Sequence, residues 1–205
     1  LLIALTGCRE TPKAPEMSAD REAPAKTLLE KLAGKHGFEN WDKVRRLQFT
    51  FNVDRDTSHF ERTWIWEPAG NRVTSITGGD TLTYVRDQVD SLTLRTDAAF
   101  INDKYWLLAP YQWVWDAASF THEYAETDQA PISGQPASRL TIVYGNEGGY
   151  TPGDAYDFFF GKDSVVREWV YRKGNQPEPS LATTWEEYME VEGLLLATHH
   201  QNAEI

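Results

Sequence analysis

The sequence predicts a mainly β (α+β) fold: one long antiparallel sheet, a helix before it and a second helix inserted midway. Three observations lead to this prediction. Apolar and polar residues alternate in many short segments, as they do in half-buried strands. Turn-forming Gly, Pro, Asn and Asp residues separate these segments at short intervals. In two places the apolar spacing changes to the period of an α-helix.

The first folded element is predicted to be a helix over residues 25–36. Leucines and alanines recur there at intervals of three and four residues, which places them on one helix face. Gly37 follows at the position of a C-terminal cap. A short helical turn is expected over residues 40–44, before the first strand.

The strand pattern is clearest over residues 46–54, where Leu47, Phe49, Phe51 and Val53 alternate with polar residues. Further segments of this kind follow closely, and turn sequences such as Pro-Ala-Gly-Asn separate them. Such spacing is typical of a meander of antiparallel hairpins. These strands are expected at residues 59–67, 72–77, 81–86 and 91–94.

The second helix is predicted over residues 97–108, where Ile101 and Tyr105 share a face and Lys104 lies beside it. Pro110 is expected to end this helix, ahead of an aromatic cluster at residues 111–115. Strand periodicity then returns, and the glycine-rich segment 145–153 is expected to be a loop between two of these strands. The strands are expected at residues 120–125, 139–144, 155–161, 164–173, 182–191 and 194–198.

Charge and composition exclude some classes of function. The chain has 31 acidic and 20 basic residues and a net charge of −11. This balance disfavours nucleic-acid binding, which depends on Lys and Arg contacts to phosphates, and electrostatic docking on anionic lipids. Eight Trp, nine Tyr and nine Phe make 13% of the chain aromatic. Such enrichment indicates a β-rich core, a binding cavity or both.

The N-terminus combines a short apolar run with Cys8, the single cysteine of the sequence. The run is too short for a transmembrane helix, which needs about 20 apolar residues. Leu5-Thr6-Gly7-Cys8 resembles the lipobox of bacterial lipoproteins. The resemblance implies that residues 1–7 are the remnant of a signal peptide and that Cys8 carries the lipid anchor. The alternative is an ordinary apolar N-terminus with a chance cysteine.

Residues 8–24 are expected to be a flexible tether, because this segment is rich in proline and charge and poor in large apolar residues. The folded domain would then span residues 25–205. A lipoprotein of this design belongs in the bacterial cell envelope. Arg9 follows the cysteine in place of the aspartate linked to inner-membrane retention in enteric bacteria, which favours the outer membrane, facing the periplasm.

The order of predicted elements resembles the LolA/LolB superfamily of bacterial lipoprotein carriers. The resemblance rests on a helix before the first strand, the antiparallel meander, and the mid-chain segment Tyr105-Trp106-Leu107-Leu108-Ala109-Pro110-Tyr111. The closing pattern from Trp185 to Leu194 is similar too. It implies a sheet curled into an incomplete (half) β-barrel, with the two helices covering its concave side. The hollow would hold acyl chains or other lipids.

Aromatic side chains are the candidate lining of this hollow. Two predicted strands are apolar on both faces, in the segments 64–66 and 158–160, which indicates cover on both sides or a cavity wall. The alternative is an ordinary core packed with large rings. The candidate ligand-binding residues are Trp64, Trp66, Tyr105, Trp106, Trp113, Phe158, Phe160 and Trp169.

Patterns that would support catalysis or a metal site are weak. The sequence lacks the GxSxG motif of serine hydrolases. His199-His200 is a poor ligand pair and is expected at the surface, and Asp154, Asp157 and Glu147 lack the spacing of a calcium loop. We therefore expect a non-enzymatic envelope lipoprotein, without metal or cofactor, that binds or transports a lipid or other hydrophobic ligand. The alternatives are a protein–protein scaffold and, more weakly, an enzyme of unknown reaction on the same fold.

Overall fold

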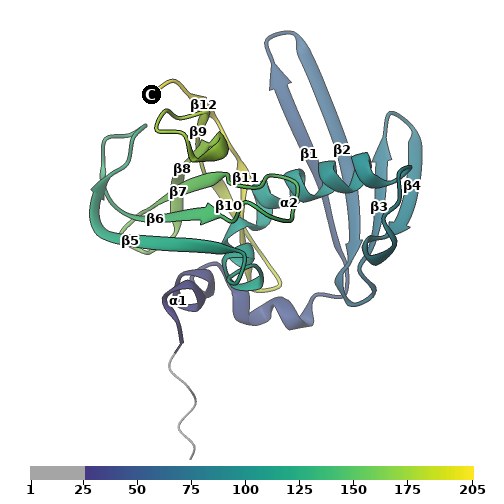
Figure 1. The fold of residues 1–205 in the computed structure, drawn as a ribbon, viewed down its shortest axis with the longest axis horizontal. Coiled ribbons are helices and arrows are strands. Elements are labelled where there is room, and N and C mark those ends of the chain that lie inside the picture. The colour runs from purple at the N-terminus through teal and green to yellow at the C-terminus, as the bar shows by residue number, and fades with distance from the viewer. Residues whose placement is uncertain (1–25) are drawn as a thin grey trace, which may run out of the picture.

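A computed structural model describes residues 26–205 (Figure 1). The predictions of a lipidated Cys8 and of a tether over residues 8–24 lie outside the described residues. Helix α1 spans Leu28–Gly34, and the Thr27 hydroxyl accepts a hydrogen bond from the Glu30 N–H at 3.2 Å. The Glu30 carboxylate binds the Thr27 N–H in return, which completes a capping box.

The first sheet is a four-stranded antiparallel meander in the order β1-β2-β3-β4. A 3₁₀ helix, η1 (Phe38–Lys43), leads into it. The predicted strand at 91–94 is wrong, because the Asp90 carboxylate accepts hydrogen bonds from the N–H groups of Leu92 and Thr93 and forms a turn there. The strands are β1 (Leu47–Arg55), β2 (Ser58–Glu67), β3 (Arg72–Thr77) and β4 (Asp80–Val85).

Helix α2 spans Leu94–Trp115 and is longer than predicted at both ends. Pro110 lies inside it, so the prediction that this proline ends the helix is wrong. The helix instead bends at Leu108, whose φ of −120° and ψ of 20° depart from helical values, and then continues through the aromatic cluster. Within residues 26–205, no helix combines the length and apolar character needed to cross a membrane.

The second sheet is six-stranded and antiparallel, in the order β12-β9-β8-β7-β6-β5. Strands β10 and β11 pair with each other and continue the same hairpin beyond a break at Trp185. The Thr184 N–H still binds the Gln201 carbonyl at 3.0 Å across this break. The strands are β5 (Phe120–Gln129), β6 (Pro136–Tyr144), β7 (Ala155–Phe160), β8 (Val166–Arg172), β9 (Leu181–Thr184), β10 (Glu186–Val191), β11 (Leu194–His199) and β12 (Asn202–Ala203).

The prediction of a mainly β protein with antiparallel sheets and few helices is confirmed. Hydrogen-bonded pairing stops between β4 and β5, so the described strands do not form the one long sheet that we expected. Helix α2 separates the two groups of strands and extends from one toward the other (Figure 1). Its residues divide between two hydrophobic clusters: Phe100, Leu108 and Tyr111 against the first sheet, and Tyr105, Ala109 and Trp113 against the second.

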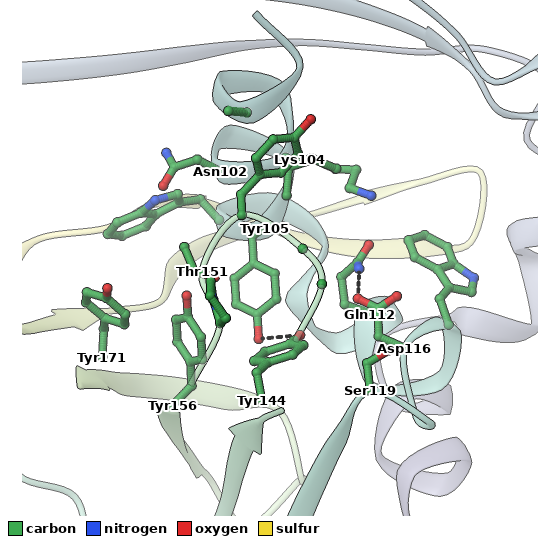
Figure 2. Close-up of a pocket in the computed structure, with 18 of the residues that line it drawn as sticks. Asn102, Lys104, Tyr105, Gln112, Asp116, Ser119, Tyr144, Thr151, Tyr156 and Tyr171 are labelled. Carbon is green, nitrogen blue, oxygen red and sulfur yellow. Dashed lines mark hydrogen bonds between the residues drawn. The ribbon is translucent and has the colours of Figure 1, made fainter. Parts of the chain in front are cut away.

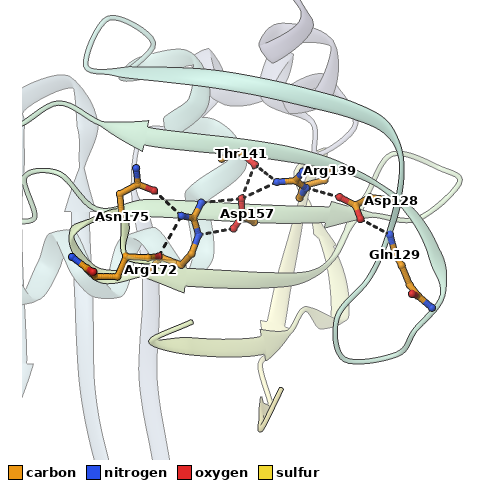
Figure 3. A network of polar contacts seen from close by, with 8 residues as sticks. Asp128, Gln129, Arg139, Thr141, Asp157, Arg172 and Asn175 are labelled. Atoms are coloured by element: carbon orange, nitrogen blue, oxygen red, sulfur yellow. Dashed lines mark hydrogen bonds and ion pairs between the residues drawn. The ribbon is translucent and has the colours of Figure 1, made fainter. Parts of the chain in front are cut away.

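A polar network lies on the face of the second sheet away from α2 (Figure 3). Asp157 is at its centre, where its carboxylate accepts hydrogen bonds from the Thr141 hydroxyl at 2.6 Å and from Arg172 Nε at 2.9 Å. Arg139 binds Asp128 at 2.6 Å and joins the two carboxylates. The paired charges make this network a structural tie between strands. Within residues 26–205, no group of His, Cys, Asp or Glu side chains is arranged to hold a metal ion.

Candidate ligand-binding cavity

A cavity of about 730 Å³ lies along α2, beneath the loop of residues 145–153 that connects β6 to β7. We call this segment the cover loop. Residues from both sheets complete the wall, among them Trp66 of β2 and Trp169 of β8. The volume falls in the range of roughly 300–1,000 Å³ that is typical of small-molecule sites. Figure 2 shows Tyr105 at the centre of the cavity, with Thr151 of the cover loop beside it.

Aromatic rings line one end of the cavity, which we call the aromatic end: Tyr105, Trp106, Tyr156, Trp169 and Tyr171. The rings of Tyr105 and Tyr156 lie 4.8 Å apart, and those of Trp106 and Trp169 lie 4.7 Å apart, measured between centroids. Burial raises the pKa of the Tyr105 hydroxyl well above its ordinary value, so this group stays neutral. The aromatic end is therefore an uncharged and largely apolar surface.

The opposite end of the cavity, which we call the polar end, is built around Lys104 (Figure 2). Its ammonium nitrogen lies 5.0 Å from the ring centroid of Trp66, 5.7 Å from that of Phe100 and 5.6 Å from that of Trp115. These distances are within the range of cation–π attraction. Only 4% of Lys104 is exposed. Burial, with the positive charge of Arg86, lowers the pKa of the Lys104 ammonium to about 8.

Gln112 and Asp116 lie beside Lys104 at the polar end, one turn apart at the C-terminal part of α2 (Figure 2). The Gln112 amide nitrogen donates a hydrogen bond to the Asp116 carboxylate. The Gln112 side-chain oxygen and the Trp66 indole N–H are both buried without a hydrogen-bond partner in the part of the chain that the structure describes. Unsatisfied polar atoms of this kind are uncommon in packed cores. These two lie at the wall of the cavity.

The cover loop is fastened to α2 by Tyr150. Its hydroxyl donates a hydrogen bond of 2.6 Å to the Asp97 carboxylate, which also accepts hydrogen bonds from Tyr84 at 3.0 Å and Arg86 at 2.8 Å. Burial alone would raise the pKa of Asp97, but the hydrogen bonds from Arg86 and Tyr150 outweigh it, and the pKa is lowered. Asp97 is therefore ionised and anchors the cover loop to the first sheet.

The eight predicted ligand-binding residues separate into two groups of four. Trp66, Tyr105, Trp106 and Trp169 line the cavity. The other four lie in packed core away from the cavity wall: Trp64, Trp113, Phe158 and Phe160.

Specific contacts account for these core positions. The Trp64 indole N–H donates a hydrogen bond of 2.8 Å to the buried Asp103 carboxylate, which directs the ring from β2 toward α2. The Trp113 ring packs edge-on against Phe158 at 5.0 Å and Phe160 at 5.7 Å, beneath the second sheet. For these four residues the alternative of an ordinary aromatic core describes what the structure has.

The cavity residues that sequence reasoning missed are mainly polar. Lys104, Gln112 and Tyr150 were not among the candidates. A signal existed for Lys104, because it follows Phe100 by four residues and precedes Leu108 by four, so a lysine interrupts an apolar helix stripe. Residue spacing offered no comparable signal for Tyr150, which reaches α2 only through the fold of the cover loop.

Of His199 and His200, which were both expected at the surface, only His199 is exposed. His199 lies at the surface, whereas His200 packs against the rings of Trp106 at 5.4 Å and Trp185 at 4.8 Å. His200 lies just beyond β11, and through Trp106 its ring contacts α2. Comparison with family models, with curated proteins and with solved structures gives no match for this chain.

Proposed function

We propose that the chain is a non-enzymatic lipoprotein of the bacterial cell envelope that binds or transports a lipid or other hydrophobic ligand. The observation that carries the proposal is the cavity of about 730 Å³ with its aromatic end. Packed protein interiors have few voids larger than a water molecule. A cavity of this size, lined by large rings and reached beneath a loop, suits an apolar molecule better than a scaffold without a ligand.

The proposal includes the finer architecture implied by the LolA/LolB resemblance. In it, the two sheets together form an incomplete barrel, and α1 and α2 cover the concave side. Support comes from the two hydrophobic clusters, since α2 contributes side chains to both and α1 adds Leu29 and Leu32 to one of them. The barrel would then enclose its ligand between α2 and the second sheet.

Attachment and location are further parts of the proposal. Cys8 would carry the lipid anchor, residues 8–24 would form the tether, and the domain would face the periplasm from the outer membrane. The support is the lipobox-like sequence and the single cysteine. Mass spectrometry of the N-terminal peptide from membrane-purified protein tests this part, because acylation adds a defined mass to Cys8. An unmodified Cys8 in that peptide would contradict it.

Ligand binding is tested with Nile red, a neutral dye that fluoresces in apolar surroundings. We expect the dye to bind the wild-type protein and to be displaced by lipid. Ala98 lies on the cavity wall, so Ala98→Trp should fill part of the cavity and weaken dye binding by roughly ten-fold or more, equivalent to about 1.4 kcal/mol.

Ala118→Trp is the matched control, because Ala118 is exposed just beyond α2 and the same ring is added there without entering the cavity. Binding by this variant should equal that of the wild type. Equal loss in both variants, or no dye binding by the wild-type protein, would contradict the proposed function. Native mass spectrometry of the membrane-extracted protein adds an independent readout, a bound lipid mass that Ala98→Trp lacks.

A further inference from the structure

We infer that the ligand is an amphiphile with one anionic group of the carboxylate type, bound by Lys104 at the polar end. The hydrocarbon part then lies along the aromatic end. This inference rests on the proposed function and adds the chemical class of the ligand. The juxtaposition that carries it is a buried lysine without a carboxylate partner, at one end of a cavity whose other end is uncharged.

The Lys104 ammonium lacks a hydrogen-bond or ion-pair partner among residues 26–205, where only cation–π contacts and longer-range charges act on it. Buried charges are costly unless they are paired. The other buried charges around α2 follow that rule: Asp97 binds Arg86 at 2.8 Å, and Asp103 binds Arg62 at 2.8 Å. Lys104 is the exception, and its side chain forms part of the cavity wall.

The charged groups around Lys104 do not replace such a partner. Arg86 of the turn after β4 is engaged by Asp97 and repels the ammonium, while Asp97 attracts it only at longer range. Asp116 also attracts it, but its carboxylate is engaged by the Gln112 amide. Glu147 of the cover loop lines the cavity without forming an ion pair with Lys104. The Lys104 ammonium is therefore available to pair with one negative charge on a ligand.

The aromatic rings around Lys104 also indicate the sign of the charge on the ligand. Trp66 and Trp115 could serve as a cage for a cationic ligand, because ring faces attract positive charge. The Lys104 ammonium already occupies that position, 5.0 Å from Trp66 and 5.6 Å from Trp115. It would repel a second cation. The rings instead stabilise the ammonium in the absence of a ligand, and an incoming carboxylate completes its coordination.

The uncharged aromatic end of the cavity indicates that the ligand also has an apolar part. Tyr105, Tyr156 and Trp169 pack against one another there, with ring centroids 4.8 to 5.9 Å apart. A small free anion would leave this surface without a partner. A carboxylate attached to a hydrocarbon chain uses both ends of the cavity.

The test compares decanoate with decanol, which share a ten-carbon chain and differ at the head group. Binding to the wild-type protein is measured by displacement of Nile red at pH 7, where Lys104 is charged. We expect decanoate to bind roughly 10- to 100-fold more tightly than decanol, the range expected for a hydrogen bond to a charged group. Acetate, which has the head group alone, should not displace the dye.

Lys104→Met removes the charge and keeps the length of the side chain. We expect this variant to bind decanoate and decanol equally, with decanol affinity close to that of the wild type. Lys162→Met, which removes an exposed lysine of the β7–β8 turn, is the matched control and should keep the preference. Lys104→Arg should also keep it, which provides a charged variant at the same position.

The outcomes separate a failure of the inference about the ligand from a failure of the proposed function. Equal affinity of the wild-type protein for decanoate and decanol would overturn the anionic head group, as would a preference that persists in Lys104→Met. If acetate displaces the dye as effectively as decanoate does, the inference that the ligand needs a hydrocarbon part is contradicted. If neither decanoate nor decanol displaces the dye, and the dye itself does not bind, the proposed function fails along with the inference. The comparison of ligands on the wild type does not depend on the stability of any variant.

Discussion

At the scale of single residues, His36 shows how one buried polar ring can join several elements. Its Nδ1 lies 3.1 Å from the Leu32 carbonyl, and its Nε2 accepts a hydrogen bond of 3.3 Å from the Val166 N–H. The His36 carbonyl accepts hydrogen bonds from the Tyr111 hydroxyl and the Leu195 N–H. Because Nε2 is an acceptor in this arrangement, the ring is neutral. One residue thus connects α1, α2, β8 and β11.

This neutral ring makes folding stability depend on pH. Burial lowers the pKa of His36 to about 4, from 6.5 in the unfolded chain. As the pH falls below 6.5, the unfolded chain takes up a proton that the folded protein does not. The stability from His36 is therefore complete above pH 6.5 and is lost as the pH falls toward 4. The loss is about 1.4 kcal/mol per pH unit within that window and about 3 kcal/mol in total.

Urea unfolding at pH 7 and pH 5 measures the effect. His36→Asn keeps a donor for the Leu32 carbonyl but does not titrate. We expect this variant to be less stable at pH 7 by about 1–3 kcal/mol and to lose less stability than the wild type between the two pH values. Burial lowers the pKa of His200 to about 4 as well, so some pH dependence of the same sign remains in the variant. Equal losses in the two proteins would contradict the role of His36.

Of the large rings predicted to bind a ligand, half line the cavity, whereas the polar residues of its wall were not predicted. Trp66 was chosen because its segment is apolar on both faces, and Tyr105, Trp106 and Trp169 were grouped with it as aromatic residues. Lys104 was not chosen, since a lysine in a helix is normally solvated. Its burial depends on packing of α2 against both sheets, a property of the tertiary structure that helical spacing only hints at.

At the scale of elements, the cover loop has a single side-chain hydrogen bond that holds it to α2. The loop contains Gly148 and Gly149, both with positive φ, and its backbone makes few hydrogen bonds beyond its ends. Segments with so few ties open at low cost in free energy. We therefore expect the hydrogen bond between Tyr150 and Asp97 to limit opening of the cover loop.

Tyr150→Phe removes this hydroxyl and keeps the ring. We expect amide hydrogen exchange in residues 146–152 and the release of Nile red to become roughly five-fold faster, equivalent to about 1 kcal/mol. Tyr188→Phe removes another hydroxyl, which donates to the Val166 carbonyl at 2.6 Å far along the chain from the cover loop. It should leave both rates unchanged. Unchanged rates in Tyr150→Phe itself would show that the ring, and not the hydroxyl, holds the loop.

Element boundaries were predictable wherever local pattern decides them. The strand at 72–77 has the predicted bounds, and most of the others differ by one to four residues at an end. The errors occur where a specific contact overrides the pattern. Pro110 leaves the Trp106 carbonyl without its helical donor, yet α2 continues past it after a bend at Leu108. The packing of α2 against both hydrophobic clusters, which keeps it helical beyond the proline, has no local signature.

At the scale of the whole molecule, the N-terminal and C-terminal parts meet at two glycines. Gly37, with φ of 84°, approaches Gly193, with φ of 80°, so closely that an added Cβ at Gly37 would lie 1.9 Å from the Gly193 carbonyl oxygen. The Asn40 amide donates a hydrogen bond of 3.1 Å to the same oxygen. This contact fixes the β10–β11 turn against η1. Gly37 was predicted as a helix cap, but its role in this contact could not be read from the sequence.

Gly37→Ala tests the contact. Gly79→Ala is the matched control, because Gly79 also has a positive φ, of 92°, but an added Cβ there meets nothing within 4 Å. We expect Gly79→Ala to cost about 1–2 kcal/mol from backbone conformation alone. Gly37→Ala should cost roughly 1–3 kcal/mol more, because the backbone must move to relieve the overlap. Urea unfolding of both variants measures the difference, and equal costs would contradict a close approach at Gly37.

The hairpin of β10 and β11 has a consequence for biosynthesis. Chains are made from the N-terminus, and Leu194 and Leu196 follow every other residue of the first sheet's hydrophobic cluster along the chain. Ala197, two positions before His199, belongs to the cluster of the second sheet. Before β11 has been made, both hydrophobic clusters around α2 lack the residues that this strand contributes. We therefore expect the protein to bind its ligand only after β11 has been made, because both hydrophobic clusters need residues of that strand.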